Sequence, residues 1–168
     1  MLVRLLRHRL ALRVAVGALA LAALAAGLLA HHTAVRRLAP ALPARALSGR
    51  AVTVAELHGR PAALVFFASW CEDCRVEANA VERFARSSAG RGRVVAVDYD
   101  DAGDVRGFLA SHGWTIPVLE DPNGTVGAAY NINNIPATVV LDPGGRIASV
   151  HYGAETVAGL RGALTAAG

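Results

Sequence analysis

The stretch that decides the fold is residues 62–77, AALVFFASWCEDCRVE. Its first eight residues form an almost unbroken apolar run with β-branched and aromatic side chains, which is typical of a central strand buried on both faces. The residues that follow place apolar side chains on one helical face, and two glycines, Gly90 and Gly92, end the pattern. The pattern predicts a buried strand that leads directly into a helix, with both cysteines of the chain at the junction.

The remainder of the chain continues this alternation of strands and helices. We expect strands at residues 93–100 and 115–121, helices at 101–113, 125–131 and 155–167, and a hairpin at 137–153 that turns at 142–145. Such an order predicts an α/β fold with a mixed central sheet, parallel in its first part, and helices on both faces.

The charges divide the chain into a basic head and an acidic body. Residues 1–50 contain eight arginines and no acidic residue, whereas residues 51–168 contain nine arginines and all thirteen acidic residues. The net charge of +4 therefore comes from the head, and the acidic body argues against nucleic acid as a partner.

The basic head also contains an apolar segment. Residues 14–30 are seventeen uncharged apolar residues, and a helix of that length spans roughly 25 Å, enough to cross a bilayer with flanking side chains at the interfaces. We expect residues 1–32 to be an N-terminal transmembrane anchor or, alternatively, a cleaved signal peptide. Residues 33–50, with Pro40 and Pro43, are expected to form a linker, and residues 51–168 the folded domain.

Cys71 and Cys74 have three possible fates: a disulfide, a metal site, or simple packing. At a helix N-terminus, free N–H groups and the helix dipole favour a thiolate at Cys71, and Cys74 lies one turn away, within reach of a disulfide. A structural zinc site needs four ligands, and the sequence has no second cysteine pair. The spacing at a strand-to-helix junction therefore favours a redox centre. Simple packing is disfavoured, because an exposed Trp70 directly before the pair would have no packing role.

The segment FFASWCEDCRVE, residues 66–77, resembles the active site of the thioredoxin superfamily. Three further segments are similar to its membrane-anchored TlpA-like and ResA-like branch: LHGRPAALVFFASWC at 57–71, IPVLEDPNGTVGAAYNI at 116–132 and NNIPATVVLDPGGRI at 133–147. The resemblance covers nearly all of residues 41–168 and also the single N-terminal span. It implies a thioredoxin-like fold and thiol–disulfide oxidoreductase activity, with the Cys71–Cys74 disulfide and no other cofactor or metal.

The resemblance also assigns roles to individual residues. Cys71 is expected to attack a substrate disulfide, and the more buried Cys74 to resolve the mixed disulfide. The Ile135–Pro136 peptide is expected to be cis and, with Trp70, to shape the substrate groove; by sequence alone Ile116–Pro117 is a second candidate.

Two departures from the family pattern concern the acids around the cysteines. Many members of the superfamily carry a buried Asp where this chain has Val65, so Glu77 or water would have to manage protons; an ordinary solvated helix acid remains the alternative for Glu77. Asp73 replaces the usual Pro before the second cysteine and, with Glu72, places negative charge beside the thiols. Because like charge disfavours the thiolate, we expect a comparatively reducing couple.

These observations predict an extracytoplasmic, membrane-anchored oxidoreductase. Its expected partners are disulfide-containing exported proteins, for example apocytochrome c, and a membrane thiol carrier that supplies electrons; the protein is expected to be a monomer. One alternative is a disulfide-forming oxidase. The other is a copper-delivery module that uses the two thiolates and a distant histidine such as His151.

Overall fold

A computed structural model describes residue 17 and residues 36–168, and the folded part is a compact unit that spans Arg37–Gly168. Its centre is a six-stranded sheet with the strand order β1-β4-β3-β2-β5-β6. The strands are β1 (Ala46–Ser48), β2 (Ala62–Phe67), β3 (Val94–Tyr99), β4 (Val118–Asp121), β5 (Ala137–Leu141) and β6 (Ile147–Tyr152). Strands β2, β3 and β4 are parallel, and β1, β5 and β6 are antiparallel to their neighbours. The predicted mixed sheet is confirmed.

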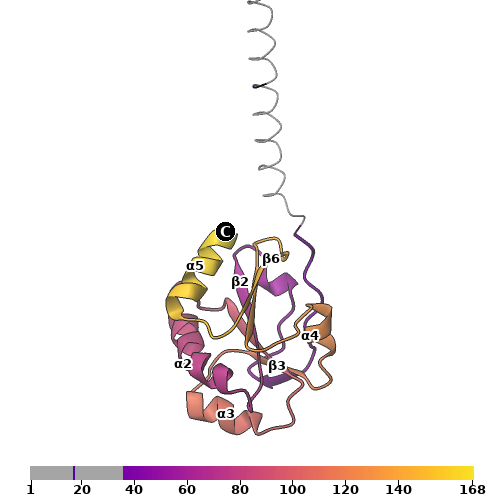
Figure 1. Ribbon diagram of the computed structural model, residues 1–168, viewed down its shortest axis with the longest axis vertical. Coiled ribbons are helices and arrows are strands. Elements are labelled where there is room, and N and C mark those ends of the chain that lie inside the picture. Colours follow the sequence, from indigo (N-terminus) through magenta and orange to yellow (C-terminus); the bar gives the residue numbers. More distant parts are fainter. Residues whose placement is uncertain (1–16, 18–35) are drawn as a thin grey trace, which may run out of the picture. The chain divides into compact units, whose positions relative to one another are not determined.

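Helices cover both faces of the sheet (Figure 1). The elements are the 3₁₀ helix η1 (Ala55–Leu57) and the helices α2 (Glu72–Arg86), α3 (Val105–His112), α4 (Thr125–Ala129) and α5 (Val157–Ala167). Apolar side chains of α2, α3 and α5 pack on one face. Residues of η1 and the segment after α4, together with residues 39–54, pack on the other.

Strand β2 is the axis of the core. All six of its residues are buried, because it lies between β3 and β5 and both of its faces are covered. Burying a large aliphatic or aromatic side chain contributes about 1.5–3 kcal/mol, so this strand is held firmly by the two apolar clusters. The rigid strand in turn holds the loop that begins at Ser69, from which the cysteines follow.

The N-terminal boundary of the folded unit differs from the prediction. Residues 33–50 were expected to be a linker, yet Ala46–Ser48 forms β1 on the edge of β4, and Arg45 makes an ion pair with Glu120. The hydroxyl of Tyr130 also donates a 2.6 Å hydrogen bond to the carbonyl of Pro40. The segment is therefore part of the domain from Arg37 onward.

The predicted membrane anchor, residues 1–32, lies outside the described residues except for residue 17. Within the part of the chain that the structure describes, no helix combines the length and the apolar character needed to cross a bilayer.

Candidate active site

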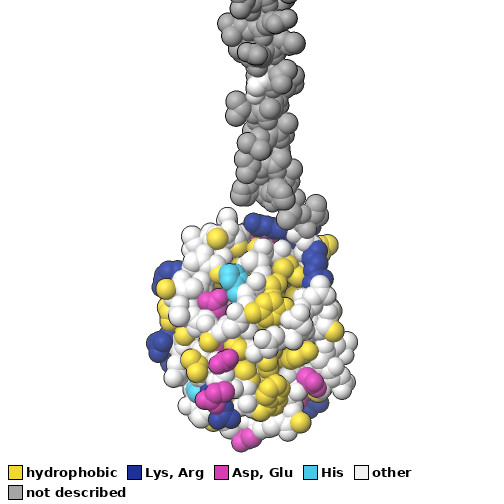
Figure 2. Space-filling model, viewed as in Figure 1, with side chains coloured by type: hydrophobic (Ala, Val, Ile, Leu, Met, Phe, Trp, Pro, Cys, Tyr) yellow, Lys and Arg dark blue, Asp and Glu magenta, His cyan; other side chains and the backbone are white. Residues whose placement is uncertain are grey.

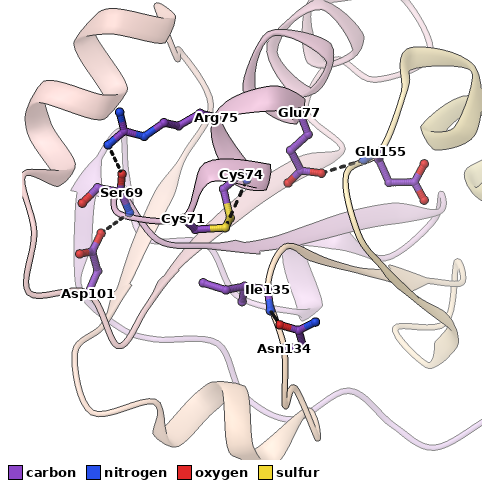
Figure 3. Close-up of a disulfide and its surroundings, with 9 residues drawn as sticks. All are labelled: Ser69, Cys71, Cys74, Arg75, Glu77, Asp101, Asn134, Ile135 and Glu155. Atoms are coloured by element: carbon purple, nitrogen blue, oxygen red, sulfur yellow. Dashed lines mark hydrogen bonds between the residues drawn. A yellow bond between two sulfur atoms is a disulfide. The ribbon is translucent and has the colours of Figure 1, made fainter.

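Cys71 and Cys74 form a disulfide at the start of α2 (Figure 3). Cys71 is the N-cap residue of the helix, and the backbone N–H of Cys74 donates a 3.2 Å hydrogen bond to its Sγ. The N-terminal N–H groups of a helix have no partner within the helix and favour an anion. The predicted position of Cys71 at the helix N-terminus is confirmed.

Exposure differs along this short stretch. The side chain of Trp70 is 60% exposed, Cys71 is 7% exposed and Cys74 is 1% exposed. A tryptophan that projects into solvent beside a disulfide contributes little to the core, whereas it offers an apolar surface to another molecule. The order of exposure agrees with attack at Cys71 and resolution at Cys74.

The second predicted element of the site is the Ile135–Pro136 peptide, which is cis. No other cis peptide is present in the described residues, so the sequence alternative at Ile116–Pro117 is wrong. Ile135 is partly buried and packs against the apolar cluster that contains both cysteines, and Pro136 is buried where it leads into β5. Figure 3 shows Ile135 and the preceding Asn134 in the surroundings of the disulfide.

Glu77 is a buried acid, only 1% exposed, one turn beyond Cys74 on α2. Its Oε2 accepts a 2.9 Å hydrogen bond from the backbone N–H of Glu155, whereas its Oε1 has no partner among the described residues. Burial raises the pKa of Glu77 to about 7; the hydrogen bond from Glu155 opposes this rise and the negative charge of Glu155 adds to it. The alternative of an ordinary solvated acid is therefore wrong, and Val65 in β2 is fully buried.

A carboxyl pair that sequence reasoning missed lies at the end of β3. Asp98 is 3% exposed, and its side chain shares a hydrogen bond with that of Asp101. Asp101 in turn accepts hydrogen bonds from the backbone N–H groups of Ser69 and Gly103. Burial, followed by the charge of Asp101, raises the pKa of Asp98 to about 8. Asp98 lies beside Phe67 in the sheet, so its position next to the site could be inferred only after β2 and β3 were paired.

This pair and an arginine hold the loop before the cysteines. Asp101 binds the N–H of Ser69, and Arg75 donates a 2.9 Å hydrogen bond from Nη2 to the carbonyl of Ser69. Both polar groups of the Ser69 backbone are thus fixed by side chains on opposite sides of the loop, as Figure 3 shows. The loop that presents Trp70 and Cys71 is positioned by the segment after β3 and by α2 together.

A pocket of about 400 Å³ opens beside this loop, lined by residues that include Trp70, Arg75, Asp104, Phe108 and His112. On the face of the domain drawn in Figure 2, hydrophobic side chains lie open between acidic and basic ones. The large exposed hydrophobic residues of the domain are Leu38, Trp70, Val76, Val150 and Tyr152. Trp70 is the one that directly precedes the disulfide.

His151, the histidine that the sequence offers to a metal, has protein partners. Its Nε2 lies 2.8 Å from the hydroxyl of Ser149, and its Nδ1 lies 3.5 Å from Oε1 of Glu155. Within the described residues, no group of three or more His, Cys, Asp and Glu side chains is arranged to hold a metal ion.

Comparison with known proteins places this geometry in a family. The model of the AhpC/TSA family matches residues 35–150. The chain belongs to the AhpC/TSA family. The thioredoxin-like protein YneN of Bacillus subtilis is 34% identical over 122 residues, which are 70% of this chain and 71% of YneN. The thiol-disulfide oxidoreductase ResA of Oceanobacillus iheyensis is 32% identical over 115 residues, which are 67% of this chain and 60% of ResA.

Solved structures of similar proteins agree with the assignment of this chain to the AhpC/TSA family. A putative thiol:disulfide interchange protein DsbE from Chlorobium tepidum is 28% identical, with a TM-score of 0.66 over 78% of this chain and 95% of that one. A secreted Mycobacterium tuberculosis disulfide oxidoreductase homologous to E. coli DsbE is 27% identical, with a TM-score of 0.62 over 79% and 99%. With the Cys71–Cys74 pair, these relatives identify a ResA-like thiol–disulfide oxidoreductase with a thioredoxin-like fold.

Proposed function

We propose that this protein is an extracytoplasmic, membrane-anchored reductase of disulfides in exported proteins. The observation that carries the proposal is the disulfide itself, which caps α2 beside the exposed Trp70 and has the buried acid Glu77 one turn behind Cys74. A first thiol that is more exposed than the second, and a proton acceptor near the second, suit a two-step exchange.

The exchange begins from the dithiol form. The Cys71 thiolate attacks one sulfur of a substrate disulfide; the Cys71–substrate S–S bond forms, the substrate S–S bond breaks, and one substrate thiolate leaves. Cys74 then gives its proton to the Glu77 carboxylate and attacks Cys71, which releases the second substrate thiolate and leaves the Cys71–Cys74 disulfide. Two electrons pass from the protein to the substrate. A dithiol carrier of the membrane would return them by the same chemistry, leaving as its own disulfide.

The acidic residues between the cysteines favour the reducing direction. Glu72 and Asp73 directly follow Cys71 in the chain, and both side chains are exposed in the first turn of α2. Their negative charges oppose the helix dipole and disfavour the thiolate of the reduced form. A less stable reduced form has a lower reduction potential, and such a couple gives electrons to substrate disulfides.

The N-terminal sequence and the relatives support the proposed location. Residues 14–30 are long enough and apolar enough for a single span. Among the relatives, one is named a soluble secreted antigen, MPT53 of Mycobacterium tuberculosis, and one solved neighbour is described as secreted. Persistent substrate disulfides are found in such compartments. We include apocytochrome c among the proposed substrates because of the ResA resemblance.

The full chain, purified in detergent, tests the direction of the reaction. We expect the reduced protein to reduce insulin, and Cys71→Ser to abolish this activity. In cells, Cys74→Ser leaves the mixed disulfide unresolved, so exported substrate proteins should be captured on Cys71 and can be identified after the membrane fraction is isolated. Failure of the reduced wild-type chain to reduce insulin or any model disulfide would refute the reductase. Rapid oxidation of reduced, unfolded proteins by the disulfide form would favour the oxidase instead.

A further inference from the structure

The loop between β6 and α5 links the buried acid to an ion pair at the surface. The backbone N–H of Glu155 holds Oε2 of Glu77 at 2.9 Å. The side chain of Glu155 points away from Glu77, as Figure 3 shows, and its Oε1 lies 3.5 Å from Nδ1 of His151. The His151 side chain is 39% exposed and that of Glu155 is 15% exposed. Glu155 therefore contacts Glu77 through its backbone and His151 through its side chain.

The fold dictates this arrangement. In β6, His151 pairs with Thr138 of β5, and the neighbouring pair Val140–Ser149 belongs to the sheet face covered by α2 and α5. His151 is thus on the same side of the sheet as Glu77. The chain then turns through Gly153, which has a positive φ of 93°, and brings residue 155 back against α2. Thr156 caps α5 with its hydroxyl, which fixes the loop directly after Glu155.

Among the described residues, few charges act on Glu77. Within its own helix, Asp73 lies one turn earlier with an exposed side chain, and the titratable Cys74 lies three residues earlier. From the facing loop, the negative charge of Glu155 opposes ionisation of Glu77. His151 on β6 faces Glu155, and an imidazolium there would offset that charge.

We propose that Glu155 and His151 are a pH-responsive positioning pair that decides when Glu77 is charged and therefore when Cys74 can resolve a mixed disulfide. This inference rests on the proposed function, because it gives Glu77 the role of proton acceptor. When His151 is protonated, Glu155 is neutralised and Glu77 ionises more readily. When His151 loses its proton, the charge of Glu155 is uncompensated and Glu77 retains its proton to higher pH. The pair spreads the ionisation of Glu77 over a wider pH range than an isolated carboxyl would show.

Two substitutions should act in opposite directions. Glu155→Gln keeps the backbone N–H and the side-chain size but removes the negative charge, so the pH midpoint of Glu77 should fall by about 0.5 pH unit. His151→Gln removes the compensating positive charge, so the same midpoint should rise by about 0.5 pH unit. These sizes correspond to the ~0.2–1 kcal/mol typical of partly exposed ion pairs. A merely structural loss at the loop would move both midpoints the same way.

The midpoint can be measured without relying on catalysis. ¹³C NMR of the full chain in detergent, labelled at the glutamate carboxyls, follows the titration of Glu77, whose resonance is assigned by its absence in Glu77→Gln. Glu56→Gln and His58→Gln are the matched controls, since they change the same charges at η1, away from α2 and α5, and should leave the midpoint unchanged. Circular dichroism establishes that each variant is folded.

The kinetic counterpart is the rate of the second thiol release from a preformed mixed disulfide, measured against pH. Its inflection should move with the NMR midpoint in each variant. Midpoints that stay in place, or that move in the same direction in both variants, would overturn the inference. An NMR shift as expected in a protein that reduces no disulfide would instead overturn the proposed function and leave the electrostatic coupling established.

Discussion

Replacing Glu72 and Asp73 with Gln and Asn is expected to make the Cys71–Cys74 couple more oxidising. Both side chains are exposed in the first turn of α2, and they directly follow Cys71, whose sulfur becomes the thiolate. Removing them stabilises the thiolate, and with it the reduced form of the protein. The reduction potential of the disulfide should therefore rise.

The size of the effect follows from the exposure of the two acids. A unit charge about 7 Å from another in a water-like medium contributes about 0.6 kcal/mol, and two such charges about 1 kcal/mol. This corresponds to a fall of about 0.7 unit in the pKa of the Cys71 thiol and a rise of about 20 mV for a two-electron couple. Loss of first-turn acids also weakens the helix by about 0.3–1 kcal/mol each, so the melting temperature should fall while the potential rises.

The potential can be measured by equilibrating the protein with glutathione buffers at neutral pH and counting free thiols by alkylation. The pKa of Cys71 can be measured from the ultraviolet absorbance of its thiolate. Glu56→Gln is the matched control, because it removes an exposed carboxylate from η1 and should change neither quantity. A double variant whose potential is unchanged or lower than that of the wild type would show that the acidic dipeptide does not set the direction of electron flow.

Three further substitutions test the site. Glu77→Gln should slow release of the second substrate thiol by about 10²-fold, the lower end of general-base effects, and should abolish the inflection near pH 7 in that step; stopped-flow release from a preformed mixed disulfide measures both. Asp98→Asn should remove a loss of stability that the wild type shows between about pH 4 and 8. In that window a carboxyl whose pKa is raised in the folded state binds more protons in that state than in the unfolded chain, so the folded wild type loses stability as the pH rises. Thermal unfolding at both ends of the window should show the variant to be more stable than the wild type, by about 1 kcal/mol, only on the alkaline side. Trp70→Ala should change the unfolding free energy by less than about 0.5 kcal/mol, since the side chain is exposed, but raise KM for protein disulfides about tenfold; equal KM values for variant and wild type would contradict a substrate contact.

Elements with a strong local pattern could be predicted from the sequence. The apolar run of β2, the helical spacing of α2 and the turn at residues 142–145 all lie where they were expected, because burial on both faces and turn chemistry act within a few residues. Strand β1 was missed because its three residues have no period of their own; it exists through its pairing with β4. Local propensity carries little information about such a short edge strand.

The residues of the site also fall into those that the sequence could predict and those that it could not. The cysteines and the cis peptide at Pro136 could be located by motif, whereas the partners of the buried acids could not. In the sequence, Asp98 is a single polar residue near the end of an apolar strand, and nothing there indicates a role in the site. Only the register of β2 with β3 shows that it lies beside the loop that starts at Ser69. Contacts between residues so distant in the sequence depend on tertiary packing, which no periodicity reports.

The buried acid of this site is carried by α2 and not by the central strand, which ties the site to the packing of the helices. In a superfamily member with an acid at the position of Val65, the carboxyl would be held by the central strand. Here that strand is wholly apolar, and the acid comes from α2 as Glu77, with its hydrogen bond supplied by the loop that leads into α5. In the proposed mechanism, proton transfer at Cys74 therefore depends on how well α5 packs. Substitutions that loosen Leu160, which is fully buried in the cluster that contains the cysteines, should release the Glu155 backbone contact and impair the resolving step before the sheet itself unfolds.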